Sequence, residues 1–138
     1  MASLVKSWRI SGAGILIEWM GGILTDGILG GILSTLTYGP NIAVNLALGN
    51  AFVVSITDAV AFQTDNPTNP PPTGFNTWLF ITYKNVSGGA HGAGTFGTLY
   101  KTSAALAAIA DTKNRTIAFQ WNGTNYVEMW RTAADVAN

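Results

Sequence analysis

The segment TIAFQWNGTNYVEMWR, residues 116–131, decides the fold class of this chain. Every second residue from Ile117 to Trp121 is large and apolar, which is the two-residue period of a strand. Asn122-Gly123 follows, and a second run of strand-forming residues comes after it. An Asn-Gly pair between two such runs predicts a β-hairpin with a type I′ turn, because both central positions of that turn need a positive φ.

Further strands are predicted upstream of this hairpin. Three segments have the β-branched and aromatic composition of strands, namely 50–57, 59–64 and 75–84. Breaks separate them: four of the five prolines fall in 66–74, and five glycines in 86–97 predict a loop. Residues 103–110 are Ala-rich and could form a short helix, although one of this length is marginal on its own. The pattern predicts a mainly β fold, a small sandwich or barrel-like domain over residues 37–138.

Residues 1–36 differ from the rest and form a Gly-rich, apolar N-terminal arm. The triplet Gly-Ile-Leu occurs four times, and apolar pairs recur at steps of four, four, five and four residues. That spacing is near a helix period, yet seven glycines between Gly12 and Gly31 each cost a helix about 1 kcal/mol. Both a Gly-rich amphipathic helix and short strands joined by tight turns remain open.

The arm is predicted to dock on a partner protein or on sister subunits. Glu18 and Asp26 interrupt the apolar run, so no membrane insertion is expected. The candidate docking residues are the large apolar side chains of this arm: Ile15, Leu16, Trp19, Met20, Ile23, Leu24, Ile28, Leu29, Ile32 and Leu33.

Charge is scarce along the whole chain. Only 14 of 138 residues are Asp, Glu, Lys or Arg, which is 10% against roughly 25% in average proteins. Such a chain is expected to bury much of its surface in subunit contacts. Seven basic residues balance seven acidic ones without a basic stripe, so nucleic acid is not an expected partner.

The candidates for chemistry are weak, and no catalytic, metal or cofactor site is predicted. His91, the only histidine, lies in a Gly-rich stretch and is expected to be solvated or at an interface. Asp58 and Asp65 are expected to be cap and turn residues rather than a catalytic carboxylate pair. Residues 92–97 match GxGxxG but lack the βαβ context of a dinucleotide site. Three formal glycosylation sequons, at Asn85, Asn114 and Asn122, matter only in a eukaryotic secretory pathway.

Aromatic residues of the β-part form the last candidate set. Exposed rings stack on sugars, whereas buried rings fill a sheet core or a subunit interface, and the second interpretation is favoured. The set comprises Trp78, Phe80, Tyr83, Trp121, Tyr126 and Trp130.

An ordered series of motifs over residues 37–138 resembles a known β-domain. The motifs are Thr37-Tyr38-Gly39 with Asn41, Leu48-Gly49-Asn50 with Phe52, Asn66-Pro67-Thr68-Asn69-Pro70, Lys84-Asn85, Ser87-Gly88-Gly89-Ala90, Tyr100-Lys101, Arg115-Thr116-Ile117, Phe119, Trp121-Asn122-Gly123-Thr124, Val127-Glu128, Arg131 and Ala134-Asp135-Val136-Ala137-Asn138. This series is similar to the β-domain at the C-terminal ends of many tailed-phage and prophage virion proteins, including tail fibres, tailspikes and small head or tail decorations. Residue 137 is Ala where that pattern has Pro, and residues 1–36 lie outside the resemblance.

The resemblance implies a homotrimeric, solvent-facing module with no catalytic residues to carry over. The predicted function is a non-enzymatic bacteriophage structural protein, a capsid decoration (cement) subunit assembled in the host cytoplasm and exposed on the virion surface. Its expected partners are its own copies and other virion proteins of the capsid or tail. The alternative is a tail-fibre or spike tip that binds host surface glycans.

Overall fold

The computed structural model describes residues 23–25, 28–30, 33–91 and 93–138. Its strands are β1 (Ile23–Thr25), β2 (Ile28–Gly30), β3 (Leu33–Leu36), β4 (Asn41–Ile42), β5 (Ala51–Ile56), β6 (Phe62–Thr64), β7 (Trp78–Asn85), β8 (Gly94–Phe96), β9 (Tyr100–Lys101), β10 (Lys113–Trp121), β11 (Tyr126–Arg131) and β12 (Val136–Ala137). One 3-10 helix spans Leu46–Leu48, and the described part of the chain contains no α-helix. The mainly β fold class predicted from the sequence is confirmed.

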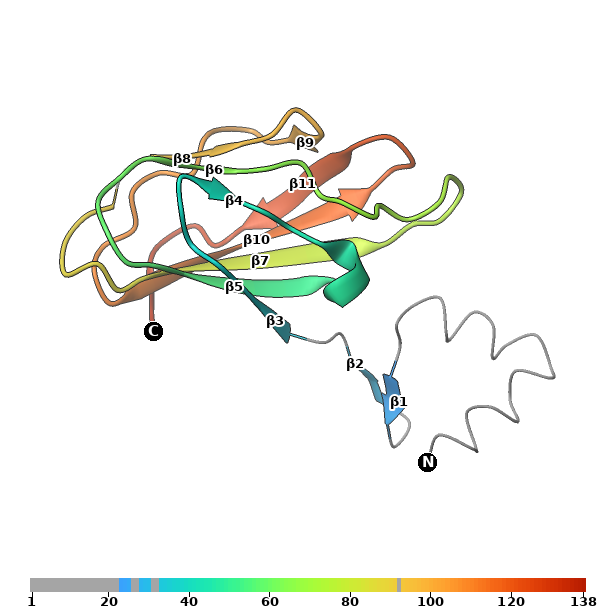
Figure 1. The fold of residues 1–138 in the computed structure, drawn as a ribbon, viewed down its shortest axis with the longest axis horizontal. Helices are drawn as coiled ribbons and strands as arrows, with labels where there is room; N and C mark the ends of the chain where they lie inside the picture. The colour runs from blue at the N-terminus through green and yellow to red at the C-terminus, as the bar shows by residue number, and fades with distance from the viewer. Residues whose placement is uncertain (1–22, 26–27, 31–32, 92) are drawn as a thin grey trace.

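The first half of the domain is a stack of three parallel rungs. β3, β5 and β7 are parallel neighbours in one sheet, and β4, β6 and β8 are parallel neighbours in a second sheet. The chain therefore passes from sheet to sheet, and each pass adds one strand to both (Figure 1). We call residues 33–48 rung 1, residues 51–64 rung 2 and residues 78–96 rung 3.

Antiparallel strands complete the larger sheet. Its order is β3-β5-β7-β10-β11-β9, with β12 pairing beside the start of β10. The predicted hairpin is present as β10 and β11, joined by residues 122–125. The predicted type I′ turn is wrong. That turn needs a positive φ at both Asn122 and Gly123, and of these two only Gly123 has one, of 95°. The Asn122 side chain accepts hydrogen bonds from the main-chain N–H groups of Thr124 and Asn125, and it thereby organises a four-residue loop.

The core lies between the two sheets. Large buried side chains come from both, and they are Ile42, Val44, Phe52, Val54, Ile56, Phe62, Leu79, Ile81, Tyr83, Leu106, Ile109, Ile117, Phe119 and Tyr126. The rings of Phe62 (β6) and Tyr83 (β7) stack at 5.9 Å, and the Tyr83 hydroxyl lies 2.7 Å from Thr64 Oγ1. These contacts fix the separation of the two sheets.

Two predictions for loops and helices are wrong. The Gly-rich stretch 86–97 is not all loop, because it contains β8. Gly94 is needed there, since a Cβ at this position would lie 2.7 Å from the Phe62 ring. The Ala-rich stretch 103–110 forms no helix; Leu106 instead exchanges main-chain hydrogen bonds with Gly94.

Part of the N-terminal arm is described. β1 and β2 pair in antiparallel fashion from Ile23↔Gly30 to Thr25↔Ile28, which agrees with the short-strand alternative for these residues. Five predicted docking residues, Ile15, Leu16, Trp19, Met20 and Ile32, lie outside the described residues. Leu33–Leu36, at the end of the predicted arm, forms β3 and pairs with β5, so sheet pairing in the large sheet begins at Leu33.

Candidate functional site

The outer face of the larger sheet, which points away from the core, carries an apolar row. The strand registers place five residues side by side across five strands, and they are Leu33, Ala51, Phe80, Ala118 and Trp130. Their chain neighbours Phe52, Ile81 and Ile117 are buried in the core, so the row lies on the outer side of the sheet, where Ala118 is itself covered and Ala51 and Phe80 are half-buried. Leu33 is 66% exposed and Trp130 47% exposed. The row thus exposes large apolar side chains at both of its ends.

A β-bulge in β11 places Trp130 on this face. The pairing of β10 with β11 shifts between Ala118 and Phe119, so Met129 has no partner residue in the register. Because side chains alternate along a strand, the extra residue turns Trp130 outward and Arg131 inward, opposite Ile117. The sequence gives no signal for this bulge, and reasoning from sequence alone therefore missed the facing of Trp130.

Trp78 and Phe80 form the broadest part of this face. Their rings stack at a centroid distance of 6.0 Å with 14° between the planes, and Trp78 is 39% exposed. Gln120 pairs with Trp78 and so lies on the same face. We call Leu33, Trp78, Phe80 and Trp130 the aromatic face.

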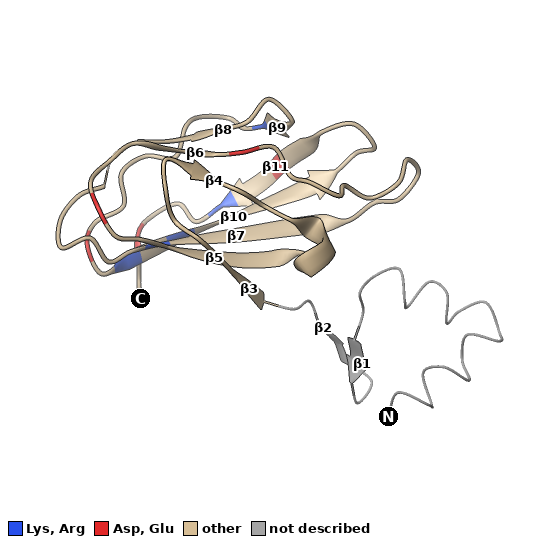
Figure 2. Ribbon diagram, in the orientation of Figure 1, with Lys and Arg blue, Asp and Glu red and all other residues tan. Residues whose placement is uncertain are grey.

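The four residues of the aromatic face are uncharged, and Lys101 lies three strands away in the register row of Trp78. β3 and β5 contain no ionisable residue, and Figure 2 shows both ribbons without blue or red along their length. The nearest charged position on the outer side of β7 is Lys84, at the far end of the strand from Trp78. Sheet surfaces that face water are normally polar, so the large apolar side chains of this face depart from the usual pattern.

The predicted aromatic set divides between this face and the core. Trp78, Phe80 and Trp130 lie on the outer face. Tyr83, Trp121 and Tyr126 are buried, as in the favoured interpretation. Burial raises the pKa of the Tyr83 and Tyr126 hydroxyls, and Tyr126 Oη has no hydrogen-bond partner among the described residues.

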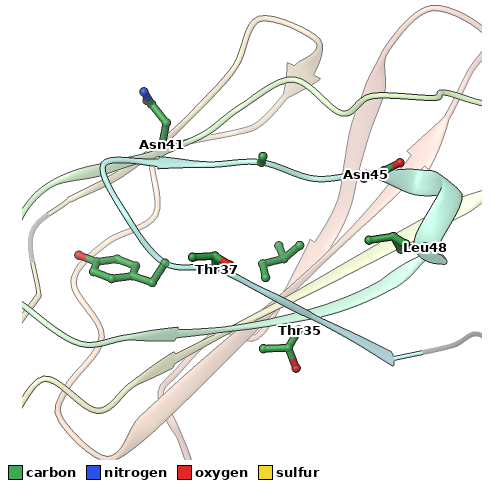
Figure 3. Close-up of a pocket in the computed structure, with 8 residues that line it drawn as sticks. Thr35, Thr37, Asn41, Asn45 and Leu48 are labelled. Atoms are coloured by element: carbon green, nitrogen blue, oxygen red, sulfur yellow. The ribbon is translucent and has the colours of Figure 1, made fainter.

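A second feature is the open end of the rung stack. A hollow of about 270 Å³ is lined by rung 1 alone, with Thr35, Leu36, Thr37, Tyr38, Asn41, Ala43, Asn45 and Leu48 around it. Figure 3 shows Leu48 reaching toward the space between β3 and β4, while Asn41 points away from it. The hollow thus lies where a further rung would stack.

The titratable candidates have structural roles. His91 is buried rather than solvated, and its Nε2 accepts a hydrogen bond from the Ile109 N–H at 2.6 Å, which corrects the prediction for this residue. Asp58 accepts from the Tyr38 hydroxyl at 2.7 Å and from the Val60 N–H, as expected of a turn residue. These bonds lower the pKa of Asp58, while burial and Asp58 raise the pKa of Tyr38 to about 12. Asp65 accepts from the Gln63 side chain.

Glu128 and Arg131 hold a loop against the sheet edge. Arg131 donates to both Glu128 carboxylate oxygens and to the carbonyls of Ala104 and Ala105, while Glu128 accepts from the Ser103 N–H. The hydrogen bond from Arg131 lowers the pKa of Glu128, and the same bond raises the pKa of Arg131. Because the carbonyls of residues 104 and 105 accept hydrogen bonds from Arg131, they are not available as acceptors within a helix, which explains why the Ala-rich stretch forms none.

Asn85 is the most strongly bonded side chain of the three sequons. It is fully buried, and its Nδ2 donates to the carbonyls of Gly89 (2.7 Å) and Ile109 (2.6 Å). Its Oδ1 accepts from the N–H and hydroxyl of Ser87. An amide so enclosed joins the end of β7 to the loop of Ser87 and Gly89 and to the segment of Ile109, and it is not an accessible glycan acceptor.

Comparisons with protein-family models, curated proteins and solved structures give no match for this chain. Among the residues that the structure describes, no group of three His, Cys, Asp or Glu side chains is placed to hold a metal ion. None of the described helices has the length and hydrophobicity to cross a membrane.

Proposed function

We propose that this chain is a non-enzymatic structural protein of a bacteriophage particle, a capsid decoration subunit on the virion surface. It works as a homotrimer of sandwich-like β-domains, in contact with other virion proteins. The aromatic face is the observation that carries this proposal. A row of apolar side chains across five strands, without a charge, is stabilised by burial at roughly 25 cal/mol per Å².

Two further features support a structural role. The low charge content of the chain fits a protein that buries much of its surface between subunits. The motif series over residues 37–138 resembles virion β-domains, and its members occupy hydrogen-bonded structural positions, as Asn85 and Asn122 do.

Sedimentation of the full chain and of two lysine variants tests the assembly. Trp130→Lys puts a charge into the aromatic face, whereas Val60→Lys changes a side chain that is 57% exposed and lies outside it. We expect the parent chain and Val60→Lys to be trimeric and Trp130→Lys to dissociate at a higher protein concentration than either, with unchanged circular dichroism. A folded Trp130→Lys variant that dissociates at the same concentration as the parent would show that this face is not the contact. A particle reconstruction that finds the chain absent from the virion would refute the proposal as a whole.

The alternative function is a tail-fibre or spike tip that binds host glycans. The exposed ring of Trp78, stacked on the half-buried ring of Phe80, favours it, because flat aromatic surfaces stack on sugar rings and Gln120 supplies an amide beside them. Glycan-array binding that Trp78→Ala abolishes without dissociating the oligomer would favour this alternative.

A further inference from the structure

The open end of rung 1 presents two strand edges that no other described strand covers. β3 is the last strand of the large sheet and β4 the last strand of the small one. The carbonyls of Pro40 and Ile42 accept hydrogen bonds from Gln63 and Asp65 of rung 2. Because main-chain groups alternate in direction along a strand, the N–H and C=O groups of the intervening Asn41 face away from rung 2. On the described part of the chain, no strand pairs with this outer side of β3 or β4.

This edge lacks the charges that usually protect one. Natural edge strands are blocked by lysines or other charged side chains against pairing with another chain. From Gly27 to Thr57 the sequence contains no Asp, Glu, Lys, Arg or His. The hollow beside the edge is lined by Leu36, Ala43 and Leu48 among others, so an incoming strand would find apolar side chains to pack against. The edge is therefore suited to accept a strand.

The described part of the arm, β1 and β2, offers short apolar strands that could be added to such an edge. β1 and β2 are three residues each, and an isolated two-stranded hairpin of this length is not stable in water without a further strand. They carry Ile and Leu from the Gly-Ile-Leu triplets. Although β2 directly precedes β3 in the chain, the two strands do not pair with each other. Among the residues that the structure describes, neither the hairpin nor the edge thus has a further strand as a partner.

We propose that the open end of rung 1 receives the hairpin strands β1 and β2 of a sister copy by strand addition. In a cyclic oligomer each arm passes to the next subunit, and every open edge is covered. Leu33, where the arm enters the sheet, belongs to the aromatic face, so the exchange occurs beside the subunit contact. This inference rests on the homo-oligomer of the proposed function.

Disulfide trapping tests the exchange. Because the sequence has no cysteine, every disulfide that forms must join the introduced cysteines. One copy carries Ala43→Cys at the open end, and a second copy carries one arm cysteine, at Ile23, Leu24, Ile28 or Leu29, so that both side-chain parities are sampled. The two copies are co-expressed at full length and oxidised. We expect a covalent pair on a non-reducing gel for at least one arm position. The matched control replaces Ala43→Cys by Ala108→Cys, an exposed alanine outside rung 1, and should give no pair.

Sedimentation of the same samples separates the possible failures. A trimer that gives no Ala43 pair with any arm position overturns the strand addition and leaves the proposed function standing. A disulfide that forms only when both cysteines are on one chain overturns exchange in favour of the copy's own arm. Equal pairing through Ala108 shows nonspecific collision and overturns the inference. A monomer overturns both the inference and the assembly on which it rests.

Discussion

Among the asparagines of the three sequons, Asn85 is expected to give the largest loss of stability when it is replaced by alanine. The side chain makes four hydrogen bonds, two through Nδ2 and two through Oδ1. At about 1 kcal/mol for each bond, the loss is about 4 kcal/mol. The buried carbonyl of Ile109 loses a donor as well, which adds to the cost.

That loss is large against the whole stability of a small domain. Domains of this size unfold with about 5–15 kcal/mol, so the variant should lose at least a quarter of that free energy. The corresponding fall in Tm is about 10–20 °C. Urea unfolding followed by tryptophan fluorescence measures the loss, at one fixed protein concentration because oligomers are stabilised by mass action.

Asn114→Ala is the matched control for this prediction. Its side chain makes one exposed hydrogen bond, from Nδ2 to the Ala137 carbonyl at 3.0 Å, so its removal should cost no more than about 1 kcal/mol. Equal losses for the two variants would refute the reasoning, because the enclosed amide of Asn85 would then contribute no more than a surface amide.

Three further predictions concern the turn, the buried hydroxyls and acid stability. Gly123→Val should lower Tm because a β-branched residue is strained at the φ of 95°, and an unchanged Tm would contradict this turn geometry. Tyr83→Phe removes a hydrogen-bonded hydroxyl and should lower the free energy of unfolding by about 1 kcal/mol. Tyr126→Phe removes a hydroxyl without a partner among the described residues and should leave that free energy unchanged or raise it. Urea unfolding that ranks the two variants in reverse would be inconsistent with the packing. Glu128 has a lowered pKa in the fold, so its contribution is present above its ordinary value of 4.5 and is lost as the pH falls below it; Glu128→Gln should flatten the acid limb of a stability–pH curve, and an unaltered limb would exclude this role.

Strands with strong local signals are predictable from sequence, and the rung stacking is not. β5 and β11 fall where the β-branched and aromatic runs predict them, and Asn122-Gly123 locates the hairpin. Parallel partners, in contrast, are far apart in the chain: Val54 pairs with Leu36 on one side and with Tyr83 on the other. No local propensity specifies such pairs, and the stack was therefore not predicted.

Short or glycine-containing strands were missed for a related reason. Gly94 begins β8 because Phe62 packs where its side chain would be, a contact that only the folded chain defines. The sequence around it predicts a loop from composition alone. The buried His91 is similar, since its partner Ile109 comes from a stretch that composition assigns to a helix.

The place of β10 in the large sheet has a consequence for synthesis on the ribosome. β7 has to pair with β10 on its second edge, yet residues 86–112 must be translated before β10 begins. At a translation rate of about 5–20 residues per second, the edge of β7 that pairs with β10 stays unpaired in the nascent chain for roughly one to five seconds. Polysomes bring several such chains together, and trans pairing through β7 competes with completion of the sheet during that interval. We therefore expect fragments that end before Lys113 to aggregate, and slow translation over residues 86–112 to lower the soluble yield of the full chain.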